Sequence, residues 1–254
     1  MDPAAPPSGS VRSGAPRLGS RPVIGVTPSL DPGLRLRAGV DYWYLSRNYT
    51  RALAGAGAAP FILGQDTPVE ACVASCDGLV LSGGGDLPRS FGDAAFQAQT
   101  WSADVPGEAE LLERISWERA LLSAFADADK PVLGVCFGMQ LMNLHFGGTL
   151  QLDLGERRTG LDHGGGGHAT AHGLSIASAS PFFSGWKPPE VVSSSHRQGI
   201  AKVATGFVAS AWAEDGVVEA IERDRLVGVE WHPESDASGA FIYARWLTLV
   251  QSQR

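Results

Sequence analysis

Two short, continuous apolar runs constrain the fold of this chain most. Gly78–Leu81 (GLVL) leads into three glycines, and Pro131–Val135 (PVLGV) leads directly into Cys136. Apolar runs of this length, bounded by turn residues, predict strands buried on both faces, as in the middle of a parallel sheet. Between them, 108–126 predicts a helix, because mainly apolar residues recur in it at helical spacing. We therefore expect a parallel sheet covered by helices.

The other expected elements alternate in type along the first half and become rich in strands after Gly147. In the first half we expect strands at 22–26 and 59–63 and helices at 42–55, at 66–76 with Asp66 as its cap, and at 138–146. In the second half we expect short strands at 170–177, 190–193, 207–212, 217–222 and 227–230, then a helix at 237–250. The expected fold class is α/β, with a mostly parallel central sheet flanked by helices and a small additional antiparallel part.

Length and composition exclude several kinds of protein. Residues 1–20 are rich in Pro, Gly, Ala and Ser, so we expect a disordered tail there. The 254 residues are enough for one well-buried domain and few for two, so we expect one domain over 21–254. A net charge of −7 without a basic patch argues against nucleic acid as a partner. No apolar run is long enough to predict a membrane span. Three cysteines, an odd and low number, suit a reducing cytoplasm.

Cys136 is the candidate nucleophile. It lies between a predicted strand and a predicted helix, with Gly134 two residues before it and Gly138 two residues after it. Glycines there let the chain turn sharply, which is the nucleophile-elbow arrangement, here in the form G-x-C-x-G. The helix N-terminus favours the thiolate, and the N–H of Phe137 is placed to face a developing oxyanion. A buried core cysteine is the alternative, but packing alone does not explain the paired glycines.

His232 is the candidate base for this nucleophile. It follows a predicted strand, and Glu234 comes two residues later, where it can accept from one ring nitrogen while the other faces the thiol. Taken alone, the motif could equally be a surface His-Pro turn beside a solvated glutamate. The glycines at 83–85 end a third strand at the same sheet edge, and one of their amides could be a second oxyanion donor. They do not form a phosphate loop, since no Lys-Ser/Thr follows.

Together these features resemble the class I glutamine amidotransferase-like superfamily and, within it, the γ-glutamyl-γ-aminobutyrate hydrolase family. The matching segments hold the family's order from about residue 22 onward: LSGGGD at 81–86, KPVLGVCFGMQ at 130–140, FGGTL at 146–150, VSSSHRQ at 192–198 and VEWHPE at 229–234. The resemblance implies a flavodoxin-like fold and a catalytic triad of Cys136, His232 and Glu234.

The resemblance also implies further roles. Gly84 and Phe137 would supply the two N–H groups of the oxyanion hole. The implied substrate-binding residues are Gln140, at the amino-acid end of the γ-glutamyl group, and Ser194, Ser195, His196 and Gln198, near its α-carboxylate. A γ-glutamyl thioester on Cys136 would be released by water, giving glutamate and a small amine. The implied partners are this small-molecule substrate and a second copy in a homodimer, with no cofactor, nucleic acid or membrane.

Four departures from the family pattern concern the leaving-group pocket rather than the triad. Phe137 stands where this branch usually has Arg, and Ile115 stands where an Asp is expected in an Arg-Asp-x-x-Glu run. The loop after Asp86 is one residue shorter than usual, and Arg197 replaces a second histidine. Three interpretations therefore stay open: a free-standing γ-glutamyl amide hydrolase, a glutaminase subunit that feeds ammonia to a synthase, and a non-catalytic scaffold with the same fold.

Three weaker signals receive simple interpretations. His163, His168 and His172 surround 164–167, but we expect a flexible loop there and no metal site, because no carboxylate or cysteine cluster completes a coordination shell. Cys72 and Cys76, four residues apart, are expected to be ordinary thiols rather than a zinc or redox pair. Of the seven tryptophans, Trp231 is the one expected near the site, because it precedes the candidate base.

Overall fold

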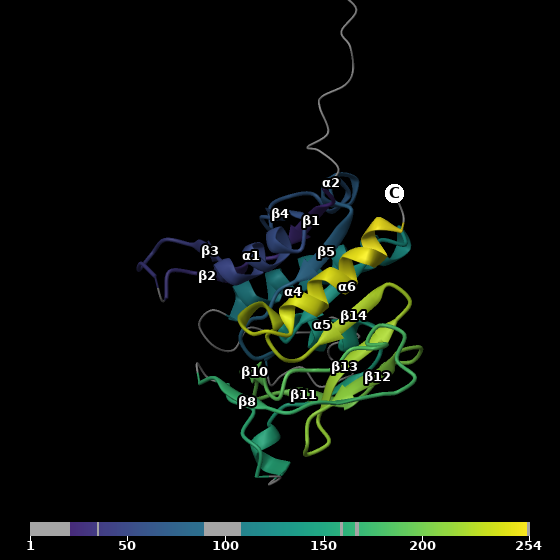
Figure 1. Ribbon diagram of the computed structural model, residues 1–254. Coiled ribbons are helices and arrows are strands. Elements are labelled where there is room, and N and C mark those ends of the chain that lie inside the picture. The colour runs from purple at the N-terminus through teal and green to yellow at the C-terminus, as the bar shows by residue number, and fades with distance from the viewer. Residues whose placement is uncertain (1–20, 35, 89–107, 158–159, 166–167, 253–254) are drawn as a thin grey trace, which may run out of the picture.

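A ten-stranded sheet organises the computed structural model, which describes residues 21–34, 36–88, 108–157, 160–165 and 168–252 (Figure 1). Its order is β4-β1-β5-β6-β14-β13-β11-β7, with β12 paired to β13 and β9 paired to β12. The parallel strands are β1 (Val23–Val26), β4 (Ala59–Ile62), β5 (Gly78–Leu81), β6 (Val132–Val135) and β14 (Leu226–Val229). The two apolar runs of the sequence thus form adjacent central strands, as predicted.

The rest of the sheet is antiparallel. It consists of β7 (Thr149–Gln151), β9 (Ser175–Ile176), β11 (Gly199–Lys202), β12 (Val208–Trp212) and β13 (Val218–Arg223). Two small antiparallel sheets lie beside it, one of β2 (Ser29–Asp31) with β3 (Tyr42–Tyr44), the other of β8 (Thr170–His172) with β10 (Val192–Ser194). The predicted α/β fold with an added antiparallel part is confirmed.

Helices cover both faces of the parallel strands. They are α1 (Arg47–Gly55), α2 (Val69–Ser75), α4 (Glu108–Asp127), α5 (Phe137–His145) and α6 (Gly239–Gln251), with short 3₁₀ turns η1 (Leu154–Arg157) and η2 (Pro233–Ser235). Along β5, Val80 belongs to the apolar cluster beneath α1 and α6, whereas Leu79 and Leu81 belong to the cluster beneath α2, α4 and α5. Alternate side chains of a strand point to opposite faces, so the continuous apolar run reflects burial on both sides.

Several predicted boundaries are wrong for local reasons. The helix expected at 42–55 begins at Arg47, because Ser46 caps it by accepting from the Asn48 amide, while the aromatic Tyr42–Tyr44 run pairs as β3. The helix expected from Asp66 begins at Val69, directly after Pro68. The strand expected at 170–177 is two strands, β8 and β9. The short strands β7 and β11 were not predicted.

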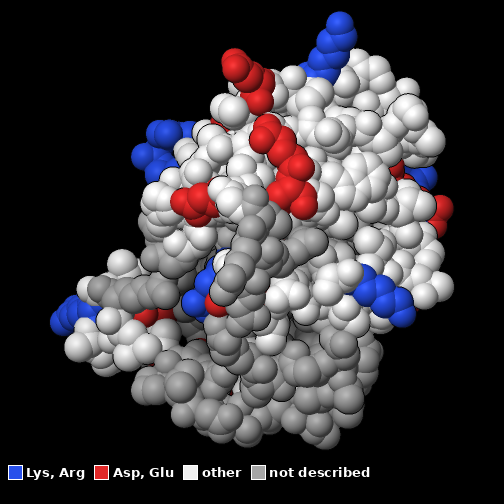
Figure 2. Space-filling model, turned by 90° about the horizontal axis from the view of Figure 1, so that it is seen from below, with Lys and Arg blue, Asp and Glu red and all other residues white. Residues whose placement is uncertain are grey.

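Some expectations concern residues outside the described ranges. The predicted tail over 1–20 lies there, as do residues 89–92 of the loop said to be one residue short. The single domain over 21–254 stays a prediction. On the face shown in Figure 2, the Lys and Arg side chains of the described residues are scattered rather than gathered into one patch. None of the helices in the described ranges is both long and apolar enough to cross a membrane.

Candidate active site

Cys136 occupies a strained turn between β6 and α5. Its backbone has φ 49° and ψ −109°, a conformation that non-glycine residues rarely adopt. Close backbone packing explains the flanking glycines: a Cβ on Gly138 would lie 2.3 Å from the carbonyl oxygen of Leu81, and one on Gly134 would lie 2.7 Å from that of Gly138. The surrounding structure therefore enforces the turn, as in a nucleophile elbow.

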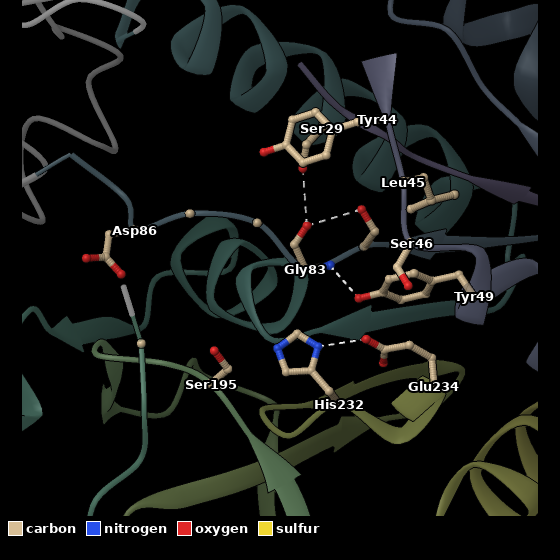
Figure 3. Close-up of a pocket in the computed structure, with 14 residues that line it drawn as sticks. Ser29, Tyr44, Leu45, Ser46, Tyr49, Gly83, Asp86, Ser195, His232 and Glu234 are labelled. Carbon is tan, nitrogen blue, oxygen red and sulfur yellow. Dashed lines mark hydrogen bonds and ion pairs between the residues drawn. The ribbon is translucent and has the colours of Figure 1, made fainter. Parts of the chain in front are cut away.

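His232 and Glu234 meet as their spacing predicts. Nδ1 of His232 lies 2.8 Å from Oε1 of Glu234, which is nearly fully buried (Figure 3). Burial alone would lower the pKa of His232, but hydrogen bonds with the Cys136 thiol and the Glu234 carboxylate raise that pKa well above its ordinary value. The imidazole thus lies between a thiol and a carboxylate, which is the order of a Cys-His-Glu triad.

A cavity of about 640 Å³ opens beside His232 (Figure 3). This volume is in the range of small-molecule sites. Its wall contains the 83–86 loop, His232 and Glu234, residues 44–46 and Tyr49 around the start of α1, and Ser195 after β10. Cys136 is 4% exposed and is not among the lining residues, so its thiol lies below the cavity surface.

The glycine loop lies against the candidate nucleophile. The N–H of Gly83 donates to the hydroxyl of Tyr49 over 2.9 Å, and burial is the main reason that the pKa of Tyr49 is well above its ordinary value. A Cβ on Gly84 would lie 3.3 Å from Cγ of Phe137. Among the described residues, the amides of Gly84 and Phe137 have no hydrogen-bond acceptor. The two residues expected to form the oxyanion hole therefore lie against each other, and their amides have no acceptor within the described residues.

Arg114 holds the glycine loop in place, a role that the sequence analysis missed. It lies on α4 and is 2% exposed. Its guanidinium donates to Oγ of Ser29 (2.7 Å), the carbonyls of Ser82 (3.1 Å) and Gly83 (3.3 Å), and Oε1 of Glu118 (2.9 Å). It also lies 4.4 Å from the centre of the Phe137 ring. The sequence does contain a signal of this role, because Arg114 and Glu118 carry opposite charges four residues apart on a predicted helix, at positions that face the core.

The predicted substrate-binding residues fall into two groups. Ser195 lines the cavity. Gln198 instead clamps the backbone of Leu87, donating to its carbonyl and accepting from its amide at 2.9 and 2.8 Å. Gln140 donates to the carbonyl of Gln198 and to Oε1 of Glu230, at 3.1 and 2.7 Å. Burial, followed by the nearby Glu219 charge, raises the pKa of Glu230 well above its ordinary value.

The remaining two predicted contacts, Ser194 and His196, lie below the cavity. The hydroxyl of Ser194 donates to the carbonyl of His163 over 2.9 Å. His196 is buried and lies in one cluster with His163, His172 and Glu219. We expected no metal site on the ground that no carboxylate or cysteine cluster completes a coordination shell, and this ground is wrong, because β13 brings Glu219 to His163 and His172.

Three other residues that the sequence analysis singled out are buried in the core. Cys72 and Cys76 are free thiols buried in the core beneath α2, as expected. Trp231 is fully buried, stacks on Trp186, and donates to Oγ of Ser238 over 2.9 Å. It is not among the cavity-lining residues, so its adjacency to His232 in sequence does not place it in the cavity wall.

Comparison with known proteins agrees with this arrangement. The family model for peptidase C26 matches residues 22–234. The chain belongs to the peptidase C26 family. A Rickettsia prowazekii protein provisionally named glutamine amidotransferase-like is 28% identical to this C26 chain, over 84% of the chain and 91% of its own length. A Mycobacterium tuberculosis protein provisionally named a glutamine amidotransferase is 34% identical, over 85% of this chain and 70% of its own.

A solved structure supports the fold of this C26 protein. The crystal structure of a Thermoplasma acidophilum protein, provisionally named as one of the subunits of a GMP synthase, superposes with a TM-score of 0.62. It covers 92% of this chain and 96% of its own at 20% identity. The family match and the two relatives confirm the predicted class I glutamine amidotransferase-like superfamily, and the C26 family indicates a cysteine hydrolase.

Proposed function

We propose that this C26 protein is a cysteine-dependent hydrolase that cleaves the γ-glutamyl amide bond of a γ-glutamylated small amine. The observation that carries the proposal is the placement of His232 between the thiol of Cys136, in its strained turn, and the carboxylate of Glu234. A thiol nucleophile beside a base that a third group orients is the requirement for acyl transfer.

The proposed reaction has two halves. The Cys136 thiolate attacks the γ-carbonyl carbon, and the N–H groups of Gly84 and Phe137 stabilise the oxyanion. Protonated His232 then gives its proton to the leaving amine as the C–N bond breaks, leaving a γ-glutamyl thioester. In the second half, His232 takes a proton from water, whose oxygen attacks the thioester. The C–S bond then breaks, which releases glutamate and restores the Cys136 thiolate beside protonated His232.

The α-carboxylate of the substrate is proposed to bind beside Ser195. This residue lines the cavity, and among the described residues its backbone N–H has no acceptor. The N–H of His196, in contrast, already donates to the carbonyl of His163 over 2.9 Å. The rim here also contains the Arg197–Asp86 ion pair, at 2.6 Å. Arg197, one of the departures from the family pattern, therefore links the two loops that form this side of the cavity.

Two other departures, Phe137 and Ile115, lie together. Both are buried in one apolar cluster with Leu87, Leu141 and Leu144. The oxyanion loop is thus supported by apolar packing at positions where the related hydrolases usually have an arginine and an aspartate. These departures leave the triad intact. We therefore expect the chemistry to be retained and the pocket around the leaving group to differ.

A second function is supported by the relatives and by Phe137. The Mycobacterium tuberculosis relative is provisionally named a glutamine amidotransferase, and several synthase-bound amidotransferases have a phenylalanine after the nucleophile. In this alternative, the same thioester chemistry acts on glutamine, and the ammonia is used by a synthase.

The isolated full-length chain distinguishes these functions. We expect it to hydrolyse members of a γ-glutamyl-amine panel, and we expect C136A to lose at least about 10⁴-fold of this activity with an unchanged circular dichroism spectrum. Turnover of glutamine only after a synthase is added would favour the alternative. If the folded chain is inert and a glutamine-analogue electrophile leaves Cys136 unlabelled, the protein is a scaffold and both proposals fail.

A further inference from the structure

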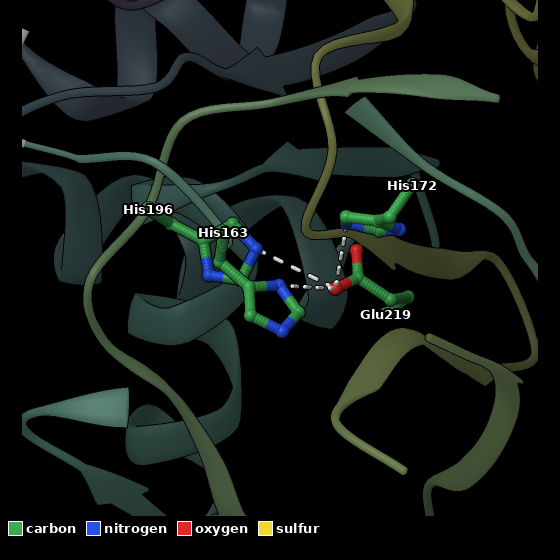
Figure 4. A group of neighbouring side chains, drawn as sticks. All are labelled: His163, His172, His196 and Glu219. Carbon is green, nitrogen blue, oxygen red and sulfur yellow. Dashed lines mark ion pairs between the residues drawn. The ribbon is translucent and has the colours of Figure 1, made fainter. Parts of the chain in front are cut away.

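Apart from the candidate triad, a second cluster of titratable side chains is buried in the structure (Figure 4). It contains His163 from the loop after η1, His172 at the end of β8, His196 after β10, and Glu219 on β13. Each of the four is at most 4% exposed. Buried imidazoles and carboxylates are expected to have polar partners, because an unpaired group loses the hydrogen bonds it would make with water.

The four side chains converge on one point. Oε1 of Glu219 lies 3.5 Å from Nδ1 of His163, 3.4 Å from Nε2 of His172 and 3.4 Å from Nε2 of His196. All four atoms lie within 4.8 Å of one another, yet none makes a hydrogen bond with acceptable geometry. These separations instead match a metal site, because two ligand atoms that each lie about 2.1 Å from a tetrahedral zinc ion are about 3.4 Å apart.

The outward ring nitrogens of the histidines are all engaged. Nδ1 of His172 lies 3.0 Å from the carbonyl of Gly173, and Nδ1 of His196 lies 2.9 Å from the carbonyl of Gln198. Nε2 of His163 lies 3.1 Å from Oδ2 of Asp215. This is how metal-binding histidines are oriented in proteins, with the second nitrogen donating to a carboxylate or carbonyl.

Those outer partners determine what the inner nitrogens present. A carbonyl only accepts, so the outer nitrogens of His172 and His196 carry protons. In the neutral rings, the inner nitrogens then direct lone pairs at the Glu219 carboxylate. Lone pairs that face a carboxylate oxygen repel it, and one cation bound between the four atoms would give each of them a partner.

We propose that His163, His172, His196 and Glu219 bind one divalent transition-metal ion, with zinc the best match. Three imidazoles and one carboxylate form a donor set that zinc accepts, and four protein ligands in a buried cluster close the shell, as in structural zinc sites. The ion would have no open position for a substrate or water, so its role is to hold the protein together rather than to act in the reaction.

The metal would link the segments that build one wall of the cavity. Gly165 and Ser195 line the cavity, and each lies within two residues of a proposed ligand, His163 or His196. The ion would tie these two segments to β13, in the antiparallel part of the main sheet. It would thereby fix the position of the proposed α-carboxylate site without contacting the substrate.

Zinc content and cobalt spectra test the site directly, and neither requires turnover. We use full-length C136A, because the wild-type thiol and His232 could bind zinc themselves. After incubation with zinc and removal of the free ion, we expect about one zinc per chain and a raised melting temperature. Cobalt(II) in the same site should give the intense visible bands of tetrahedral coordination.

Matched histidine variants in the C136A background locate the metal. H172A should weaken zinc binding by at least about 100-fold, whereas H168A should leave it unchanged, since His168 lies in the same segment but is exposed and pairs with Asp162. If H172A does not fold, the cobalt spectrum of C136A decides. The site is refuted if folded C136A keeps no zinc and shows no thermal shift, or if H172A and H168A bind zinc equally.

Discussion

His232 has two contacts, and the proposed mechanism gives each of them a different role. One ring nitrogen lies beside Glu234, and the ring also interacts with the Cys136 thiol. Proton transfer to and from the thiol needs the imidazole itself, whereas the glutamate orients the ring and stabilises its charged form. Loss of the imidazole should therefore cost more than loss of the carboxylate's charge.

The first prediction compares H232Q with E234Q. We expect H232Q to reduce kcat on the best γ-glutamyl amide by about 10⁴-fold or more, and E234Q to cause a loss about 10 to 100 times smaller. Steady-state kinetics of both purified variants measures the two losses. Equal losses, or a greater loss in E234Q, would contradict the roles given to these residues.

The second prediction is a pH dependence of stability. The pKa of His232 is raised on folding, so its contribution is fully present below the unfolded-state pKa of about 6.5 and is lost as pH rises through the folded-state value. The difference in free energy of unfolding between wild type and H232Q should therefore shrink above pH 6.5. Urea titrations from pH 5.5 to 9 measure this difference in free energy. The control is C136A/E234Q, in which His232 lacks both of its partners. A difference that grows with pH would disprove the interpretation.

At the residue scale, the sequence was informative where partners are close in the chain. Glu234 is two positions after His232, and each glycine is two positions from Cys136, so local spacing predicted these contacts. The contact of Arg114 with Gly83 and that of Gln198 with Leu87 join distant segments. The same residue types could have bound a substrate or solvent, and the spacing contained no information to decide this.

At the element scale, prediction succeeded where apolar periodicity is strong and failed where strands are short. The buried side of α4 follows its predicted pattern, including Glu118, whose burial is balanced by Arg114. The strands β7 and β11 have three and four residues, and pairing across the sheet rather than local pattern defines them. Gly199 and Gly147, close to these strands, also weaken any strand signal.

The third prediction concerns the apolar cluster that joins α4 to α5. F137R would place an unpaired charge in this cluster and close to Arg114, so we expect a loss of about 3 kcal/mol in the free energy of unfolding. Adding I115D should recover at least about 1 kcal/mol relative to the sum of the single changes, since a carboxylate could then pair with the new cation. Urea denaturation of the four proteins in this double-mutant cycle measures the coupling. Additive losses would show that the two positions are independent.

At the scale of the whole molecule, apolar clusters extend through both parts of the sheet, and the second half of the chain adds a buried polar cluster. The clusters on the two faces of the parallel strands continue into the antiparallel part, where Ala220 and Ile221 of β13 belong to one cluster each. In the antiparallel part, Glu219 and three histidines occupy fully buried positions, which hydrophobic packing alone does not explain. These four residues lie on four separate segments, so their convergence depends on the fold of the second half, which the sequence predicted only as a set of short strands.

The fourth prediction follows from the proposed metal site. Chelation of the metal should speed amide hydrogen exchange in the segments that carry ligands, at 160–165, 170–173 and 192–198. Amides of β5 and β6 should keep their protection, because apolar packing holds these strands. Exchange measured by mass spectrometry on C136A, with zinc and after chelation, gives the comparison, and H168A in the same background should behave like its parent. Uniform acceleration over the whole sheet would mean that the metal supports global folding, and no change anywhere would mean that no metal links these segments.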